Sequence, residues 1–541
     1  MTTHPTTTSA GDLDGHVSER AGHPETRGID LVPDSDRTGR PRQLFAVWAA
    51  PNVSYLSFAV GATLVLTGLS LPQAVGVILA GNLLWIFTGT IAASGPVAGT
   101  SGSVISRAFH GVLGNKAVLV LTGWLIAAAY LALNWSAASV AGIGLAVRMG
   151  LPDTPAVDAT VICLIAGATL LIAIYGYATI VRLYAALSIL LALVFLVVTG
   201  YVLAEADWSY TPAEPLKGAG LAVALGIGFT IVASTPLSYS NSPDLARYLP
   251  RGSSPVAIAG WTALGAYLPS VVFTSVGALA ATSLDMTDPQ AALESILPGW
   301  FVPVFVIAVV VNTMANNGMT AYSASLSIQS VGVRLARIPA VLTIGVLGTA
   351  MTLYAILVWD FLTSVNTMLQ LVVVVTGPAM AVAVTDLVMR RNRYNGADLL
   401  EQERGGPFWY HRGVHWSGIL ALVTGGLTSL MWVNTSFWIG PIAKVMGDFD
   451  LAIPSGMGVA AAVYWASSRI LRTVPRHGGA FSGTDVRPSG GWGGGGAARA
   501  GPVDRRGADP APPCGEGRVP SRRILAQFTI GHPYRPRVER S

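Results

Sequence analysis

Apolar stretches of about 20 residues recur along most of the chain, and short polar segments separate them. A helix of about 20 residues rises about 30 Å, which matches the hydrocarbon core of a bilayer. The pattern therefore predicts an all-α integral membrane protein with about twelve transmembrane helices. These helices are expected near residues 44–69, 72–93, 117–147, 156–175, 179–204, 219–239, 256–282, 300–331, 338–358, 361–389, 415–434 and 450–471.

The two ends of the chain differ from this pattern. Residues 1–43 are mostly polar, and residues 472–541 are rich in Gly, Pro and Arg with few aliphatic side chains. Such segments bury too little apolar area to offset the entropy lost on ordering. We therefore predict a disordered cytoplasmic N-terminus (1–43), a transporter domain (44–471) and a disordered cytoplasmic tail (472–541).

Two predicted helices are interrupted. In the first, Pro51 and Asn52 lie within an apolar stretch, where proline removes a backbone hydrogen bond and exposes carbonyl groups. In the sixth, Pro236 precedes a polar run. Interrupted helices that begin two five-helix halves are typical of transporters built from inverted repeats, with the binding site at the breaks. Because transmembrane helices also tolerate Pro and Gly, the breaks alone allow a purely structural interpretation.

Basic residues gather in the loops of one side. The other side has only Arg148, Lys217 and Lys444. Because cytoplasmic loops are enriched in Lys and Arg, this asymmetry predicts that both termini are cytoplasmic, in a multi-pass plasma-membrane protein. The basic side carries Arg107, Lys116, Arg182, Arg247, Arg251, Arg334, Arg337, Arg390, Arg391, Arg393, Arg404 and Arg412.

Composition narrows the class of protein. Hydrophobic residues make up 52% of the chain and charged residues 11%, against about 25% charged in soluble domains. The net charge of +5 comes from loop cations, so it does not indicate nucleic-acid binding. No metal-binding Cys/His spacing, cluster of ionisable residues at membrane depth or GxxxxGK[ST] motif is present, which argues against a metal cofactor, an enzyme and an ATP-driven pump.

Several motifs resemble the nucleobase:cation symporter family, the purine-cytosine permeases and their hydantoin and allantoin relatives. They are WAAPNVSYLSFAVGA, SGPVAGTSGSVISRAFHGVLG, the Tyr130-x-x-x-Asn134 pair, SPDLARYLPR, NTMLQLVVVVTGPAMAVAVTDLVMRR and GPFWYHRGVHW. The resemblance covers nearly all of residues 44–471. It implies twelve helices with two inverted five-helix repeats and two extra helices, a substrate site at mid-membrane, and coupling to a sodium ion or a proton.

A nucleobase is a flat, neutral, polar ring, so its site needs aromatic faces and a few amides or hydroxyls. Tyr130 and Asn134 share one face of the third helix and offer both, unless they only pack between helices. We expect Trp135 on the same helix to face lipid or pack. In the eighth helix, a run of amides in hydrocarbon points to Asn316 and Asn317.

The resemblance implies further contacts. It places substrate on Ser54 and a cation on the carbonyls of Ala50 and Val53, although a kink can also use such groups for capping. Thr320 falls where relatives often have another Asn. In the sixth helix relatives carry Trp, whereas this chain offers Phe229 and Tyr239, with Thr235 and Ser238 at the aligned positions.

The coupling ion stays open at this point. No helix centre carries an ionisable residue, and Arg182 stands where proton-coupled relatives have an acid, so sodium is slightly favoured. Against sodium, Met314 and Ala315 occupy the hydroxyl positions of sodium-coupled relatives, unless Thr313 contributes. We expect the interfacial Arg107, His110, Asp244, Arg247, Asp386 and Arg390 to serve anchoring and topology, or an intracellular gate.

The favoured function is therefore a symporter for cytosine or a purine, with no cofactor beyond the ion. Symport of hydantoin, allantoin or uracil is the alternative of the same class. A transporter-like membrane sensor without flux is the alternative of another class. The sequence leaves the oligomeric state undetermined.

Overall fold

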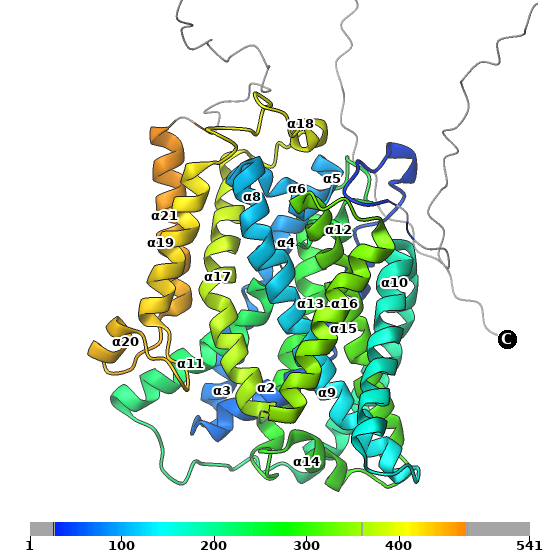
Figure 1. Ribbon diagram of the computed structural model, residues 1–541. Helices are drawn as coiled ribbons and strands as arrows, with labels where there is room; N and C mark the ends of the chain where they lie inside the picture. The colour runs from blue at the N-terminus through cyan, green and yellow to red at the C-terminus, as the bar shows by residue number, and fades with distance from the viewer. Residues whose placement is uncertain (1–24, 26, 240, 359–360, 472, 474–541) are drawn as a thin grey trace, which may run out of the picture. The chain divides into compact units, whose positions relative to one another are not determined.

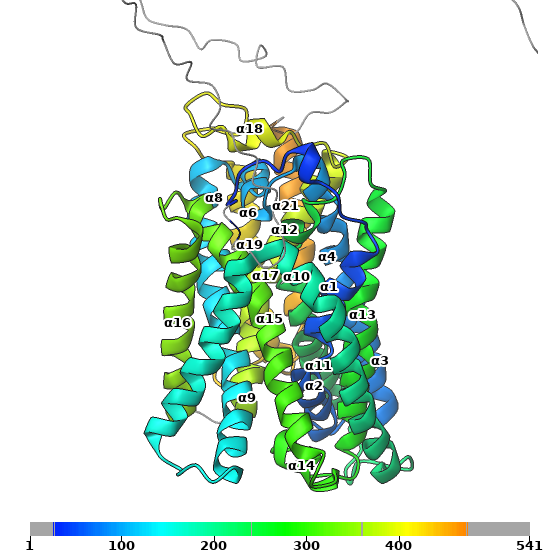
Figure 2. The ribbon, with the colours of Figure 1, turned by 90° about the vertical axis from the view of Figure 1, so that its right-hand side faces the viewer.

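The computed structural model describes residues 25, 27–239, 241–358, 361–471 and 473 (Figures 1 and 2). Their secondary structure is helical apart from two isolated β-bridges near the C-terminal helices. The predicted tail lies outside the described residues except for Thr473, so its disorder stays a prediction. The elements are η1 (Asp34–Asp36), α1 (Gln43–Asn52), α2 (Tyr55–Leu66), α3 (Leu71–Asn82), α4 (Trp85–Ala92), α5 (Ser94–Ala98), α6 (Gly102–Ile105), α7 (Arg107–His110), α8 (Val112–Leu119), η2 (Val120–Leu125), α9 (Ile126–Arg148), α10 (Pro155–Glu205), α11 (Gly218–Leu237), α12 (Pro243–Ala246), α13 (Pro255–Ala280), α14 (Pro289–Ile296), α15 (Val302–Val331), α16 (Arg337–Val358), α17 (Phe361–Met389), α18 (Gly396–Leu400), α19 (Trp416–Trp432), α20 (Pro441–Val445) and α21 (Ala452–Ile470).

Each of the twelve predicted segments contains helix, so the all-α membrane fold is confirmed. By length and apolar composition alone, eight helices of the described part can cross a membrane, or nine if α1 and α2 form one bent span. The count is lower than twelve partly because α10 is counted once. In addition, α19 has only 17 residues, and α21 does not meet the same test.

Helix α10 accounts for two predicted spans. Its 51 residues would extend about 77 Å as one straight helix, more than twice the thickness of the hydrocarbon core. Gly176 interrupts it with φ 70° and ψ −157°, a conformation that glycine adopts without steric cost. The two sides of Gly176 correspond to the predicted helices 156–175 and 179–204.

Both predicted breaks are present. Helices α1 and α2 meet at an angle of 58° across Val53 and Ser54, immediately after Pro51. Helix α11 ends at Leu237, directly after Pro236, and the chain becomes helical again only at Pro243 in α12. Proline removes one backbone donor from each helix, so the carbonyls beside each break need other partners.

Helix α1 and its break with α2 lie in the interior of the helix bundle. Helix α1 packs against α10, α13 and α15, and α15 packs in turn against α9 (Figure 2). The last two helices pair elsewhere, because α19 and α21 pack against each other and against α17 (Figure 1). The α1–α2 break is therefore surrounded by protein.

Helices α2 and α13 cross at very short range through glycines. A Cβ added at Gly61 would overlap the carbonyl oxygen of Thr274, and one added at Gly277 would overlap that of Phe58. Small residues at such crossings let transmembrane backbones approach closely. This contact holds α2 against the neighbouring helix.

We expect Gly61→Ala to lower the free energy of unfolding by about 1–3 kcal/mol, because the added methyl must push α2 and α13 apart. Thermal denaturation of the purified protein in detergent, followed by size-exclusion chromatography, measures this loss. Gly76→Ala in α3 is the matched control, since a Cβ at Gly76 meets no atom within 4 Å. Equal melting temperatures for the two variants would contradict the expectation.

The segment before α1 differs from its prediction. Residues 27–42 were expected to be disordered, but the structure gives them buried side chains and backbone pairing. The amide of Val32 donates to the carbonyl of Gly99 at 2.9 Å, and Arg37, which is 3% exposed, donates to the carbonyl of Pro96 at 2.9 Å. Polar contacts with loop backbone, together with burial of Val32 and packing of Ile29 on the core, thus hold this segment in place.

Candidate functional site

The carbonyl groups beside the α1–α2 break are bound by amide side chains of α15. Nδ2 of Asn312 lies 3.1 Å from the carbonyl oxygen of Ala50 and 2.7 Å from that of Val53. One turn later, Nδ2 of Asn316 lies 3.5 Å from the carbonyl oxygen of Pro51. Residues four apart share a helix face, so this face of α15 is directed at the break.

Tyr239 follows the other broken helix, α11, and lies among aromatic side chains. Its ring stacks on Trp85 with centroids 5.5 Å apart and meets Trp48 edge to face at 5.1 Å. Its hydroxyl donates to Oδ1 of Asn316 at 3.4 Å. Tyr239 therefore connects the second break with the α15 amides that face the first.

Tyr130 of α9 faces the same region. Its hydroxyl lies 2.6 Å from Oγ of Ser238, which in turn donates to the carbonyl of Ser234 at 2.7 Å. This pair joins α9 to the end of α11. Both Tyr130 and Ser238 are half-buried, so their edges remain accessible to a ligand.

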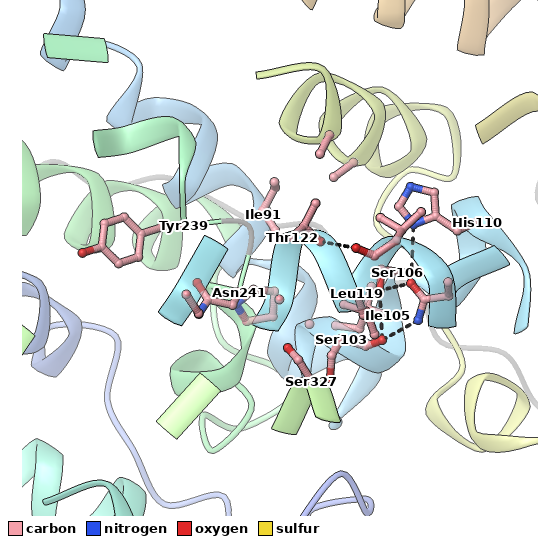
Figure 3. A pocket seen from close by; sticks show the side chains of 18 of the residues that line it. Ile91, Ser103, Ile105, Ser106, His110, Leu119, Thr122, Tyr239, Asn241 and Ser327 are labelled. Carbon is pink, nitrogen blue, oxygen red and sulfur yellow. Dashed lines mark hydrogen bonds between the residues drawn. The ribbon is translucent and has the colours of Figure 1, made fainter. Parts of the chain in front are cut away.

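A cavity begins at these residues and runs toward Ser103 of α6 and His110 of α7 (Figure 3), at the end of the bundle where α6 packs against α18. Figure 3 shows Tyr239 and Asn241 at one end of it and Ser103, Ser106 and His110 at the other. Its lining includes Ile91, Ser94, Ser103, Ser106, His110, Asn115, Thr122, Tyr130, Ser238, Tyr239, Asn241, Thr320, Ser327 and Tyr394.

Polar side chains at the α18 end of the cavity form a small network. Oγ of Ser106 donates to Oδ1 of Asn115 at 2.7 Å, and Nδ2 of Asn115 donates to the carbonyl of Ser103 at 2.8 Å. His110 lies 3.4 Å from the same Asn115 oxygen. Burial lowers the pKa of His110 to about 4, so its imidazole is neutral at physiological pH.

The structure separates the predicted substrate residues into two groups. Tyr130, Tyr239 and Thr320 line the cavity, and Asn316 contacts Tyr239 beside it. Their role in binding stays a prediction, as it does for the second group.

The second group has local structural partners. Oγ of Ser54 accepts from the amide of Leu56 as the N-cap of α2, while Asn134 donates to the carbonyl of Tyr130 and Asn317 to that of Leu131. Phe229 packs among hydrophobic side chains of the core. Trp135 packs as expected: it is fully buried and donates to Oγ1 of Thr169 at 3.1 Å.

Sequence reasoning missed the aromatic partners of Tyr239. Trp48 lies three residues before Pro51, within the quoted WAAPN motif, so its position near a break was a usable signal. Trp85 lies in the second apolar stretch, and nothing in its neighbourhood indicates a site. Only the packing of α4 against α11 brings it to Tyr239.

The six interfacial residues are all buried, at most 8% exposed, and each has polar partners. Asp244 accepts from the amide of Gly102 at 2.7 Å, and Arg107 donates to the carbonyl of Leu399 at 2.9 Å. Burial raises the pKa of Asp244 to about 6, and nearby Arg247 only partly offsets this effect. Asp244 is therefore ionised at pH 7 and takes up a proton as the pH falls through about 6.

Sequence reasoning also missed Glu25, which forms the centre of a buried cluster at the α18 end. Its Oε1 accepts from Arg247 at 3.3 Å, from the hydroxyl of Tyr248 at 2.9 Å and from that of Tyr322 at 3.1 Å. Its Oε2 accepts from the amide of Tyr177 at 2.8 Å. Glu25 and residues 27–39 are called the N-terminal strap below, because they join α10, α12 and α15.

No group of three or more His, Cys, Asp or Glu residues that could hold a metal ion occurs among the described residues. The arrangement instead offers aromatic rings, hydroxyls and amides around the breaks of two helices. These groups can bind a flat polar molecule by stacking and hydrogen bonds.

Comparisons with known proteins agree with this arrangement. Residues 31–454 match the family described as permease for cytosine/purines, uracil, thiamine, allantoin. A Bacillus subtilis (strain 168) protein, YxlA, provisionally named as a purine-cytosine permease, is 27% identical over 456 residues, which cover 82% of this chain and 95% of that protein. The purine-cytosine permease FCY2 of Saccharomyces cerevisiae is 22% identical, over 81% of this chain and 85% of its own.

The fold is that of a solved nucleobase-cation-symport-1 family transporter, Mhp1. Its closed form with bromovinylhydantoin bound gives a TM-score of 0.67 at 18% identity, covering 83% of this chain and 97% of that chain. Its inward-facing form gives 0.65 at 17% identity, covering 86% and 100%. With the family match over residues 31–454, this chain belongs to the nucleobase:cation symporter family, the permeases for cytosine, purines, uracil, thiamine and allantoin.

Proposed function

We propose that the protein is a secondary active symporter that imports a nucleobase, cytosine or a purine, together with a cation by alternating access. The observation that carries this proposal is a cavity that begins at Tyr239, whose hydroxyl contacts Asn316, the amide that also faces the α1–α2 break. Tyr130, Tyr239 and Thr320 line that end, and none of the three is charged at neutral pH. A neutral heterocycle needs ring faces and hydrogen bonds at its edge but no ion pair.

Contacts across the site suggest how substrate would act. The Tyr130–Ser238 bond joins α9 to α11, and the Tyr239–Asn316 bond joins the end of α11 to α15. A heterocycle between them would exchange these bonds for bonds to its own edge. Substrate would thereby change the distance between α11 and the helices α9 and α15. Alternating access requires such relative movement of helices.

The proposed substrate follows from the relatives, and the proposed location follows from the charge of the loops. Names of purine-cytosine permeases favour cytosine or a purine, and Mhp1 with bromovinylhydantoin bound keeps hydantoin, allantoin and uracil as alternatives. The basic loops favour a plasma-membrane protein with both termini in the cytoplasm. A sensor without flux is the outcome if substrate binds but does not accumulate.

The test is uptake of labelled cytosine, adenine, hypoxanthine, uracil, allantoin and hydantoin into cells that express the protein. We expect saturable uptake of one of these compounds, and we expect Tyr239→Ala to lower kcat/KM at least tenfold because the stacking surface is lost. Tyr239→Phe keeps the ring and loses only the hydroxyl, so a smaller loss is expected. Asn134→Ala tests whether the third-helix amide also contacts substrate.

Tyr354→Ala is the matched control, because this tyrosine of α16 is 63% exposed and does not line the cavity. Equal losses in Tyr239→Ala and Tyr354→Ala would place the substrate elsewhere. If no compound is taken up despite membrane expression, the nucleobase assignment fails and the sensor becomes the better interpretation.

A further inference from the structure

The two shortest hydrogen bonds between the first broken helix and α15 come from one amide group. Nδ2 of Asn312 is within 3.1 Å of the carbonyl oxygen of Ala50 and 2.7 Å of that of Val53. Asn312 is 2% exposed, Ala50 fully buried and Val53 3% exposed. Water therefore has little access to this contact.

The orientation of the Asn312 side chain follows from its partners. Both partners are carbonyl oxygens, which only accept hydrogen bonds. An amide oxygen facing them would bring three acceptors together, whereas the NH₂ group supplies one hydrogen to each carbonyl. The contact thus satisfies both carbonyls that the helix break leaves without helical partners.

A sodium ion fits poorly at this place. Hard cations bind through oxygen ligands, and unwound carbonyls of broken helices are the groups that transporters offer them. Here the two carbonyls already face N–H hydrogens. Thr313 is buried next to Asn312, but among the described residues the two carbonyls are contacted by the Asn312 amide and not by the Thr313 hydroxyl.

We propose that the amide nitrogen of Asn312 permanently takes the place of a cation between the α1–α2 break and α15, so that this contact forms without sodium. The inference rests on the proposed symporter function, and it removes sodium as the ion bound at these carbonyls. The Asn312 amide carries partial positive charge at the position where an ion would bridge the two helices. Because the amide is covalently attached to α15, the bridge does not depend on the sodium concentration.

The test compares sodium with choline in two measurements on the intact protein. We expect the wild-type melting temperature in detergent, and uptake of the transported compound, to be the same in both salts. Asn312→Ser leaves the two carbonyls facing a small hydroxyl, so sodium but not choline should raise its melting temperature by mass action. Asn312→Asp, which has nearly the same shape, should show a sodium effect in the same direction if the serine variant does not fold.

Asn317→Ser is the matched control, because Asn317 is a buried amide of α15 that donates to Leu131 instead of to the break. It should show no sodium effect. A rise in the wild-type melting temperature with sodium would overturn the inference, and so would the lack of a sodium effect in both Asn312 variants. The thermal measurements need no transported substrate, so failure of uptake alone would count against the proposed function and not against the role of Asn312.

Discussion

Asp386→Ala is expected to lower the free energy of unfolding by about 3–5 kcal/mol, because it leaves a buried arginine without its counter-charge. Asp386 is fully buried near the end of α17, and its two oxygens accept from Nε of Arg390 at 2.8 and 3.0 Å. The hydroxyls of Tyr394 and Tyr464 also donate to it, at 2.9 and 2.6 Å. Asp386 therefore holds α17, the loop after it and α21 together.

The variant should show an apparent melting temperature lower by on the order of 5 °C in detergent. Arg251→Ala is the matched control, because it breaks an ion pair with Asp34 in which the side chains are 61% and 72% exposed, and such pairs contribute about 0–1 kcal/mol. The double variant Asp386→Leu with Arg390→Met should lose less than Asp386→Ala, since no unpaired charge remains. Equal melting temperatures for Asp386→Ala and Arg251→Ala would show that the buried pair does not stabilise the bundle.

The fold was largely predictable because lipid imposes a strong constraint on sequence. A spanning helix must satisfy all its backbone groups internally, so long apolar stretches marked every predicted span, although not the short helices of the loops. Proline marked both breaks, because Pro51 and Pro236 cannot donate to the preceding turn. The turn at Gly176 falls between the predicted helices 156–175 and 179–204, because the apolar stretch is too long for one span and Tyr175, Gly176 and Tyr177 interrupt it.

The site was less predictable, because it depends on which side chains meet across helices. Asn312, Asn316 and Thr320 are four residues apart and so share one face of α15, but spacing cannot show that Asn312 reaches two carbonyls at the α1–α2 break. The same limit hid Trp85, which meets Tyr239 only after α4 packs on α11. The strap was missed because composition indicates only how much apolar area a segment can bury, whereas polar contacts also hold this segment.

Glu25→Ala is expected to release the N-terminal strap, and this is the second large effect that we predict. Glu25→Ala should speed tryptic cleavage after Arg37 at least tenfold, since the loss of one partner from a buried charge pair costs about 3–5 kcal/mol. Arg37 is only 3% exposed while the strap is in place, so a protease must wait for the strap to detach. Mass spectrometry of the fragments during limited digestion of the purified protein measures the rate.

We expect Glu25→Ala to release the strap because Glu25 contacts three helical segments at once. Glu25 pairs with Arg247 after α12, which continues the broken sixth helix, and with Tyr322 of α15. It also binds the turn at Gly176, where its amide donates to the carbonyl of Ile174 at 3.1 Å. Detachment of the strap must therefore break its contacts with α10, with Arg247 and with α15 together.

Ser35→Ala provides the matched control within the strap. Ser35 is exposed, and its hydroxyl donates only to the neighbouring Asp36 at 3.2 Å, so its loss should leave the cleavage rate unchanged. If Glu25→Ala and Ser35→Ala are cleaved equally slowly, Glu25 does not hold the strap. If Glu25→Ala alone is cleaved faster, one buried carboxylate holds the strap against α10, Arg247 and α15.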